Sequence, residues 1–432
     1  MSKTPSPVFF PVDLIAEIIS LLPVKSLVRF MCVSNSWNTL ISDSAFVKLH
    51  LKRTTTSRNT HFTLLVSNHY KPVDGKFSYH SSCTIIPYPI THLFDNPSAI
   101  VVADSHYFLN YDHRPMFGIV DSCNGLICLV HHDFNFTHEE YWFRLWNPST
   151  RKISQNLGYS RHLKLGFIFN FGCDDSTGTF KVVAYRFIRD EYTSEVKVFN
   201  VGDNVWRNIE SFPIVPLDFP LFPYLMGNSC NCVFLNSTLN WLALHKHIQK
   251  DPYDYGYEYD WTCLMKEITV EDLVIVSLDM GTETYNRYLL PQGFDELSSG
   301  KPTISVLGEC LCFSYFHQGT GIVMWQMKKF GVEESWIQFL KISYHVLQLY
   351  YDFSYNHFQL LPMVLSKDGD SLILCSNAMD GVNGGAIIYN CKDNSVQKIR
   401  VNVKKTITDD ESRNILYLDL AVGYVESLIS IC

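Results

Sequence analysis

A strand-and-turn pattern recurs five times between residues 143 and 399 of this chain. In each copy an apolar run ends in a polar residue, and an apolar or aromatic residue follows it, six positions later in four copies. The polar and apolar partners are Asn147 and Ile153, Asn200 and Trp206, Asp279 and Tyr285, Gln326 and Trp336 (a copy with four extra residues), and Asn390 and Val396. Alternating apolar runs broken by turn residues are typical of short antiparallel strands, so this region is predicted to be all-β.

A turn and a further apolar strand precede each copy, in the segments CNGLICLV, DSTGTFKVVAY, NSTLNWLAL, GECLCFSY and DGDSLILC. Each unit is therefore predicted to be a small antiparallel sheet of three or four strands. The copies start 53, 79, 47 and 64 residues apart, which brackets the roughly fifty-residue period of kelch-type propellers when insertions are allowed.

The repeat therefore predicts a kelch-like β-propeller with six blades, while five or seven blades stay open. Strands at 61–66 and 84–89, together with those from Ile415 onward, could complete a further blade from both chain ends. One or two β-sandwiches are the alternative fold for the same strands.

The first fifty residues have a different period. Between Pro11 and Leu22 the apolar residues recur at helical spacing, and Pro11 and Pro23 suit the start and the end of a helix. A second helix fits Lys25 to Met31, and Ser34 is a candidate N-cap for a third. The apolar pattern continues to about Leu51.

Three or four short helices are too small a unit to bury all of their own apolar surface. Two interpretations follow. The helices could pack on the domain that follows them, or they could form a docking module for another protein.

The residues from Phe10 to Leu51 resemble the F-box motif of plant F-box proteins. The blocks DLIAEI, LPVKSLVRF, CVSNSW and LISD occur in the order and at the spacing of that family. Phe10-Pro11 stands where the family has Leu-Pro, and Asp43-Ser44 where it has Asp-Pro. The resemblance implies a surface for a Skp-family adaptor that is formed or supported by Pro11, Leu14, Ile15, Ile18, Leu22, Pro23, Val24, Leu27, Val28, Cys32 and Trp37.

The rest of the chain resembles the F-box-associated, kelch-like region of the same family, in the segments DSCNGLICL, LWNPSTRK, DDSTGTFKVV and YVESL. The implied organisation is a flexible N-terminus at 1–9, an F-box at 10–51, a linker at 52–60 and a propeller at 61–428. The implied function is substrate recognition in an SCF-type cullin-RING ubiquitin ligase. In that role the F-box docks on the adaptor, and the propeller binds an unknown target protein for ubiquitination.

Composition excludes some classes of partner. The formal net charge is −8 without a block of like charges, so nucleic acid is not an expected partner. No run of eighteen apolar residues predicts a membrane span. The 13 cysteines are odd in number, lack a CxxC pair and follow no export signal, which favours reduced thiols in the cytoplasm or nucleus.

Signatures of catalysis are missing from the sequence: there is no GxSxG, HExxH, P-loop or GxGxxG motif. Two histidine groups and two cysteine pairs are candidate metal or redox sites, but packing or solvent exposure explains each group more simply. They are His245 with His247, His131 with His132 and His138, Cys230 with Cys232, and Cys310 with Cys312. We therefore expect no catalytic residue, no metal and no cofactor. A propeller enzyme and a scaffold protein acting outside a ligase are the alternatives.

One segment departs from the repeat. Residues 250–261 read KDPYDYGYEYDW, with four acids and four tyrosines. Because loops on rigid scaffolds often carry binding and tyrosine offers contact area at low entropic cost, this segment is a candidate target-binding loop. Its binding residues would be Tyr253, Tyr255, Tyr257 and Tyr259. A solvated loop without a role is the alternative.

Overall fold

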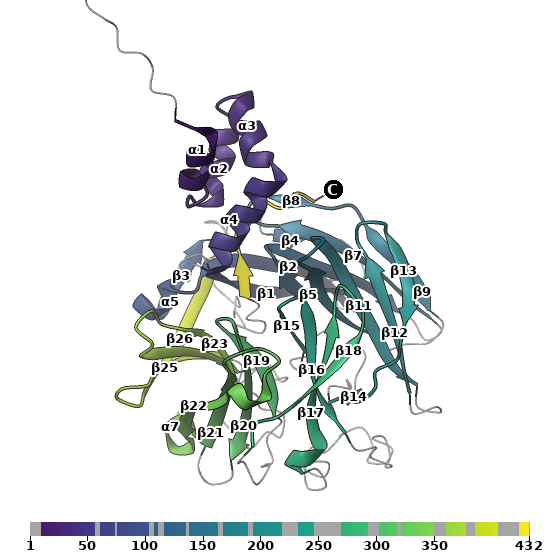
Figure 1. Ribbon diagram of the computed structural model, residues 1–432, viewed down its shortest axis with the longest axis vertical. Coiled ribbons are helices and arrows are strands. Elements are labelled where there is room, and N and C mark those ends of the chain that lie inside the picture. Colours follow the sequence, from purple (N-terminus) through teal and green to yellow (C-terminus); the bar gives the residue numbers. More distant parts are fainter. Residues whose placement is uncertain are drawn as a thin grey trace, which may run out of the picture.

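The computed structural model describes residues 10–56, 61–73, 76–102, 108–110, 116–134, 138–162, 167–188, 193–217, 232–245, 269–292, 302–317, 321–348, 360–376, 385–404 and 423–431. They form a helical lobe and a larger body of β-sheets, seen at the top and in the lower part of Figure 1. The chain begins in the lobe and returns beside it at the C-terminus.

The helical lobe consists of α1 (Val12–Ile19), α2 (Val24–Met31), α3 (Asn35–Ser42) and α4 (Ser44–Thr56). Pro11 and Pro23 lie directly before α1 and α2, where a missing N–H costs nothing. Ser34 caps α3 as predicted, since its Oγ accepts a hydrogen bond from the backbone N–H of Trp37 at 3.3 Å.

Helix α4 extends further than the sequence predicted. Asp43 caps it, because Asp43 Oδ1 accepts hydrogen bonds from the N–H groups of Ala45 (2.9 Å) and Phe46 (3.2 Å). The helix then continues to Thr56, through residues that were predicted to be linker. Buried Thr54, whose hydroxyl donates to the backbone oxygen of His50 at 2.6 Å, belongs to this extension.

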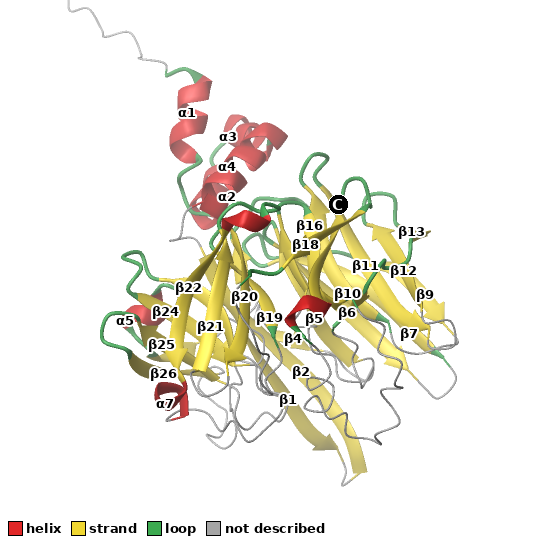
Figure 2. Cartoon of the chain, turned by 60° about the horizontal axis from the view of Figure 1, so that its bottom comes forward, coloured by secondary structure: helices red, strands yellow, loops and turns green. Residues whose placement is uncertain are grey.

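The described strands lie in six sheets, which are antiparallel except for one pair of strands in sheet VI; they are named here in chain order and drawn in Figures 1 and 2. Sheet I contains β27 (Gly423–Val425), β1 (His61–Val73), β2 (Lys76–Pro89) and β4 (Phe108–Asn110). Sheet II contains β5 (Met116–Cys123), β6 (Leu126–Phe134), β7 (Glu139–Asn147), β8 (Lys152–Ile153) and β9 (Leu157–His162). Sheet III contains β10 (Ile168–Asp174), β11 (Thr179–Ile188), β12 (Thr193–Asn200) and β13 (Val205–Ile209).

Sheet IV contains β14 (Val215–Pro216), β15 (Cys232–Leu235), β16 (Thr238–Leu244), β17 (Leu273–Asp279) and β18 (Tyr285–Leu289). Sheet V contains β19 (Thr303–Leu307), β20 (Cys310–His317), β21 (Gly321–Met327) and β22 (Trp336–Ser343). Sheet VI contains β23 (Leu360–Leu365), β24 (Ser371–Ser376), β25 (Gly385–Asn390), β26 (Ser395–Lys404) and, parallel to β26, β3 (Ser98–Val102). Short helices α5 (His92–Asp95), η4 (Val270–Asp272), η5 (Glu333–Ser335) and α7 (Tyr344–Gln348) lie between strands.

Buried clusters join neighbouring sheets from II round to I. Sheets II and III share a core around Phe143 and Phe171, III and IV one around Trp241, and IV and V one around Phe313. Further clusters join V to VI and VI to sheet I, the latter through Ile86. This arrangement is that of a propeller, because sheets III to VI are each covered by a neighbour on both faces.

Sheets II to VI are five blades of this kind. The predicted count of six depends on sheet I, which takes strands from both chain ends: His61, Phe62 and Thr63 pair with Val425, Tyr424 and Gly423. The expected pairing of the two ends is therefore present at residues 423–425, while residues 405–422 lie outside the described part of the chain.

The repeat in the sequence has a local cause. Oδ1 of each polar residue accepts a hydrogen bond from the N–H two positions later, in Asn147 (3.0 Å), Asn200 (2.8 Å), Asp279 (2.9 Å) and Asn390 (2.8 Å). Such Asx turns reverse the chain, and the apolar residue six positions later then begins or joins the next strand. Trp206, for example, pairs with Phe199 across its hairpin.

The short turns gather on one face of the propeller, the turn face. Asn124 and Ser237, from turns in sheets II and IV, both donate hydrogen bonds to the carboxylate of Asp175 in sheet III, at 3.0 and 2.8 Å. Because the strands are antiparallel, the long connections, such as the one between β16 and β17, leave from the opposite face.

Candidate functional site

Helix α1 exposes large apolar side chains to solvent. Five such side chains at its start, along it and just beyond its end are 52–72% exposed: Phe10, Val12, Leu14, Ile18 and Leu21. Leu14 and Ile18 are four residues apart, and Leu21 follows three residues later. The three side chains therefore lie on the same side of α1 and of the turn that continues it. A contiguous apolar face of this kind is characteristic of a protein-binding surface.

The opposite side of α1 is held by α4. Arg53 donates to the backbone oxygen of Glu17 and to Ser20 Oγ, and it forms an ion pair with the Glu17 carboxylate. Buried His50 donates from Nε2 to the backbone oxygen of Leu22 at 3.0 Å. Burial lowers the pKa of His50, so the ring is neutral at pH 7. These contacts orient α1 with its apolar face outward.

The eleven predicted adaptor-binding residues fall into three groups. Pro11, Leu14, Ile18, Pro23 and Cys32 are exposed, and Ile15, Leu22, Val28 and Trp37 are half-buried. Val24 and Leu27 are fully buried with Ile41 in the core of the lobe, so they can only support the surface.

The structure adds exposed residues that the prediction left out, namely Phe10, Val12, Leu21 and Val33. The position of Leu21 on this face could be predicted from the sequence, because it continues the spacing of Leu14 and Ile18. Val12 is the first residue of α1, and Phe10 and Val33 lie just outside helices, so periodicity does not indicate which side of them is free.

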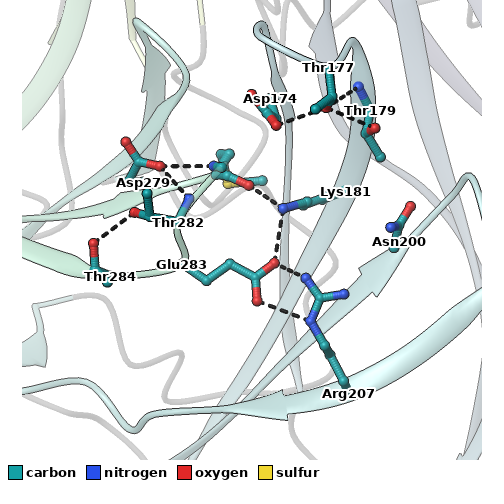
Figure 3. Close-up of polar contacts among 12 residues, drawn as sticks. Asp174, Thr177, Thr179, Lys181, Asn200, Arg207, Asp279, Thr282, Glu283 and Thr284 are labelled. Carbon is teal, nitrogen blue, oxygen red and sulfur yellow. Dashed lines mark hydrogen bonds and ion pairs between the residues drawn. The ribbon is translucent and has the colours of Figure 1, made fainter.

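On the propeller, a polar network joins sheets III and IV (Figure 3). Buried Lys181 donates to the backbone oxygen of Met280 and lies 2.9 Å from Glu283 Oε1. Arg207 approaches the same carboxylate, with Nε 3.0 Å from Glu283 Oε2. One anion between two cations links neighbouring blades, so the network is interpreted as structural.

The candidate metal-binding histidines have different surroundings. His131 is buried and stacks on Trp142 at 5.4 Å, and burial lowers its pKa to about 4. His132 Nε2 lies 3.2 Å from Glu139 Oε2, and His138 Nε2 lies 3.5 Å from Glu140 Oε1. His245 is exposed near Arg287, while His247 lies outside the described residues. Among the described residues no three metal-ligating side chains converge.

The cysteines in the described part of the chain are free thiols. Cys312 is buried in sheet V, where burial raises its pKa to about 12, and Cys310 is its partly buried neighbour. Burial also raises the pKa of Cys232, while Cys230 lies outside the described residues. Protonated thiols in apolar surroundings are poor nucleophiles, so they act here as small core residues.

The predicted target-binding tyrosines, Tyr253, Tyr255, Tyr257 and Tyr259, lie outside the described residues. The described ends of their segment are at the face opposite the short turns, where the N–H of His245 donates to the oxygen of Asp272 at 2.6 Å.

Comparison with known families agrees with this architecture. An F-box domain matches residues 10–49, and an F-box associated beta propeller domain matches residues 80–431. No helix among the described residues is long and apolar enough to cross a membrane.

Relatives cover most of the chain. An F-box/kelch-repeat protein of Arabidopsis thaliana is 28% identical over 353 residues, which are 78% of this chain and 80% of the relative. F-box protein CPR1 of Arabidopsis thaliana is 24% identical over 385 residues, 84% of this chain and 79% of that protein. A further Arabidopsis thaliana F-box protein is 28% identical over 241 residues, 54% of each chain. The chain therefore belongs to the plant F-box proteins that carry an F-box associated beta propeller domain.

Proposed function

We propose that this protein is the substrate-recognition subunit of an SCF-type cullin-RING ubiquitin ligase. The observation that carries the proposal is the exposed apolar face of α1 within a matched F-box domain. A Skp-family adaptor would cover this face, with Leu14 and Ile18 in the contact and Val24 and Leu27 holding the helices beneath it.

The chain would contribute no catalytic group of its own. It would raise the effective concentration of a target lysine near a ubiquitin-charged conjugating enzyme, by binding the adaptor and the target at once. The buried thiols with raised pKa, and the paired charges around Glu283, fit a binding scaffold better than an enzyme.

The adaptor part of the proposal is tested by calorimetry. The purified full-length chain is titrated with a plant Skp-family protein, and we expect saturable binding with an affinity stronger than micromolar. No heat of binding at tens of micromolar, the weak end of specific protein contacts, would show that the F-box does not act as an adaptor module.

We further propose that the target binds at the face opposite the short turns, with Tyr253, Tyr255, Tyr257 and Tyr259 in the contact. The support is that the described ends of their segment, at His245 and Asp272, lie at this face. Replacing the four tyrosines with serine should reduce target capture at least fivefold while adaptor affinity stays within twofold. Equal recovery of every captured protein by the variant would contradict this assignment.

We also propose that sheet I is the sixth blade. The support is the pairing of β1 with β27 and the apolar cluster that Ile86 and Ile90 share with sheet VI. A propeller leaves only short, protected sheet edges, and β27 covers the edge of β1 that would otherwise be free.

A further inference from the structure

The last described residues, 423–431, lie between the propeller and the helical lobe. Gly423, Tyr424 and Val425 form β27 in sheet I, and the chain then passes from the sheet toward α2. Alternate residues after the strand contact different parts of the molecule, as expected for a segment whose successive side chains point in opposite directions.

One set of residues holds this segment to the propeller. Asn147 donates from Nδ2 to the backbone oxygens of Ser427 (3.1 Å) and Ile429 (3.0 Å). A Cβ on Gly125 would overlap Ser427, and Gly125 has φ +80°, so glycine is required for this approach. Ile429 and Ile431 pack against the core shared by sheets II and III.

The alternate residues belong to the helical lobe. Leu428 is buried in the core of the lobe with Ile19, Val24, Leu27, Ile41 and Phe46, and it is the one member of that cluster, among the residues described, from outside 10–56.

Glu426 lies at the start of α2. The residue before α2 is Pro23, which provides no side-chain cap. Burial raises the pKa of the Glu426 carboxyl, and the backbone N–H of Val24, the first residue of the helix, and the charge of Lys25 oppose that shift, which places the carboxylate beside the free N–H groups of α2. A carboxylate at this position satisfies a free N–H and interacts favourably with the helix dipole.

We propose that Glu426 and Leu428 are positioning residues that hold the F-box in one orientation on the propeller. Asn147 and Gly125 fix the segment on one side, and the core and cap of the lobe fix it on the other. If the proposed ligase function is correct, this connection sets the span between the adaptor surface and the target-binding face, and so which target lysines reach the ubiquitin donor.

The test measures orientation in the free full-length chain, without an adaptor. Because the chain has 13 cysteines, spin labels are attached to genetically encoded azide amino acids at two exposed positions, Ser36 in α3 and Glu309 in a turn of sheet V. Electron paramagnetic resonance then gives the distribution of distances between the labels.

We expect one narrow distribution for the wild-type chain and for the exposed control variant Ser430→Asp. Leu428→Asp and Glu426→Ala should broaden the distribution at least twofold. Leu428→Met and Glu426→Gln should keep it narrow, since Met still fills the core and the Gln oxygen can still accept a hydrogen bond. A distribution as narrow in Leu428→Asp and Glu426→Ala as in the wild type would overturn the proposal.

Two controls separate this result from other failures. Circular dichroism and thermal melting must show intact helices in Glu426→Ala, the milder variant, so that broadening reports orientation and not unfolding. Adaptor titration of the wild-type chain is a separate measurement. A chain that fails to bind the adaptor would refute the ligase function and leave the distance result valid.

Discussion

The helical lobe and the propeller differ in how many large apolar side chains they expose to solvent. Of the large apolar side chains exposed in the described part of the chain, seven belong to residues 10–33 and five are spread over the sheets. The seven are Phe10, Val12, Leu14, Ile18, Leu21, Phe30 and Val33, while the five are Ile153, Tyr159, Val205, Leu289 and Ile337. The far smaller lobe therefore exposes more large apolar side chains than all the described residues of the propeller together.

The difference follows from geometry. Sheet III covers one face of sheet IV and sheet V the other, so Trp241 and Phe313, at these two contacts, are fully buried. Four short helices have no second layer, and α1 packs on one side only. The sheets thus cover one another, whereas the lobe is completed by Leu428 on one side and, in the proposed function, by an adaptor on the other.

The largest effect is expected from opening the propeller. Truncation after Asp409 removes β27, which pairs with β1, and also removes Leu428 from the lobe. The unpaired strand edges should promote aggregation, and the melting temperature should fall by about 10 °C or more. Differential scanning calorimetry with size-exclusion chromatography measures both. A monomeric truncated chain that melts like the wild type would argue against closure.

The sharpest comparison comes from placing one new charge in the helical lobe and one in the propeller, and measuring adaptor binding for both variants. Ile18→Asp should weaken adaptor binding at least about a hundredfold, because it removes roughly 1.5–3 kcal/mol of burial and forces a carboxylate to lose water, and each 1.4 kcal/mol is about tenfold.

The matched control is Val205→Asp, which changes a similarly exposed apolar residue on sheet III. Its adaptor affinity should stay within twofold of wild type by calorimetry, and both variants should keep the wild-type melting curve. If the two variants bind the adaptor equally well, the exposed face of α1 is not the docking surface.

The smallest effect concerns a carboxyl group within the propeller. Burial raises the pKa of Asp121 in β5 to about 7, with a hydrogen bond from the N–H of Ser122 opposing the shift. Since the folded pKa lies above the unfolded value, ionisation costs stability as pH rises from about 4 to 7, and the cost is constant above that range.

Asp121→Asn should therefore stabilise the chain at pH 8, by up to a few kcal/mol, and by much less at pH 4. Urea unfolding at the two pH values measures the difference. An equal increase in the free energy of unfolding at pH 4 and pH 8 would show that Asp121 ionises freely in the folded chain. The exposed Asp203→Asn is the control and should show no such dependence on pH.

Features that depend on neighbouring residues were accessible from the sequence. The Ser34 cap, the prolines before α1 and α2, and the Asx turns at Asn147 and Asn200 all arise from contacts within a few residues. Periodicity also separated helices from strands at about residue 60. The sequence left the start of α4 open, because Asp43 and Ser44 are both good caps and sequence alone does not choose between them.

The sequence by itself determined the two-part organisation, the propeller class and the F-box, because period, turn chemistry and short motifs are local properties of the chain. Only the tertiary structure decided which side of α1 is free, that the pKa of Asp121 is raised, and that Glu426 and Leu428 contact the helical lobe although nearly four hundred residues separate them from α2. These outcomes depend on which distant surfaces meet after the ring is formed. No periodicity within a strand or a helix carries that information.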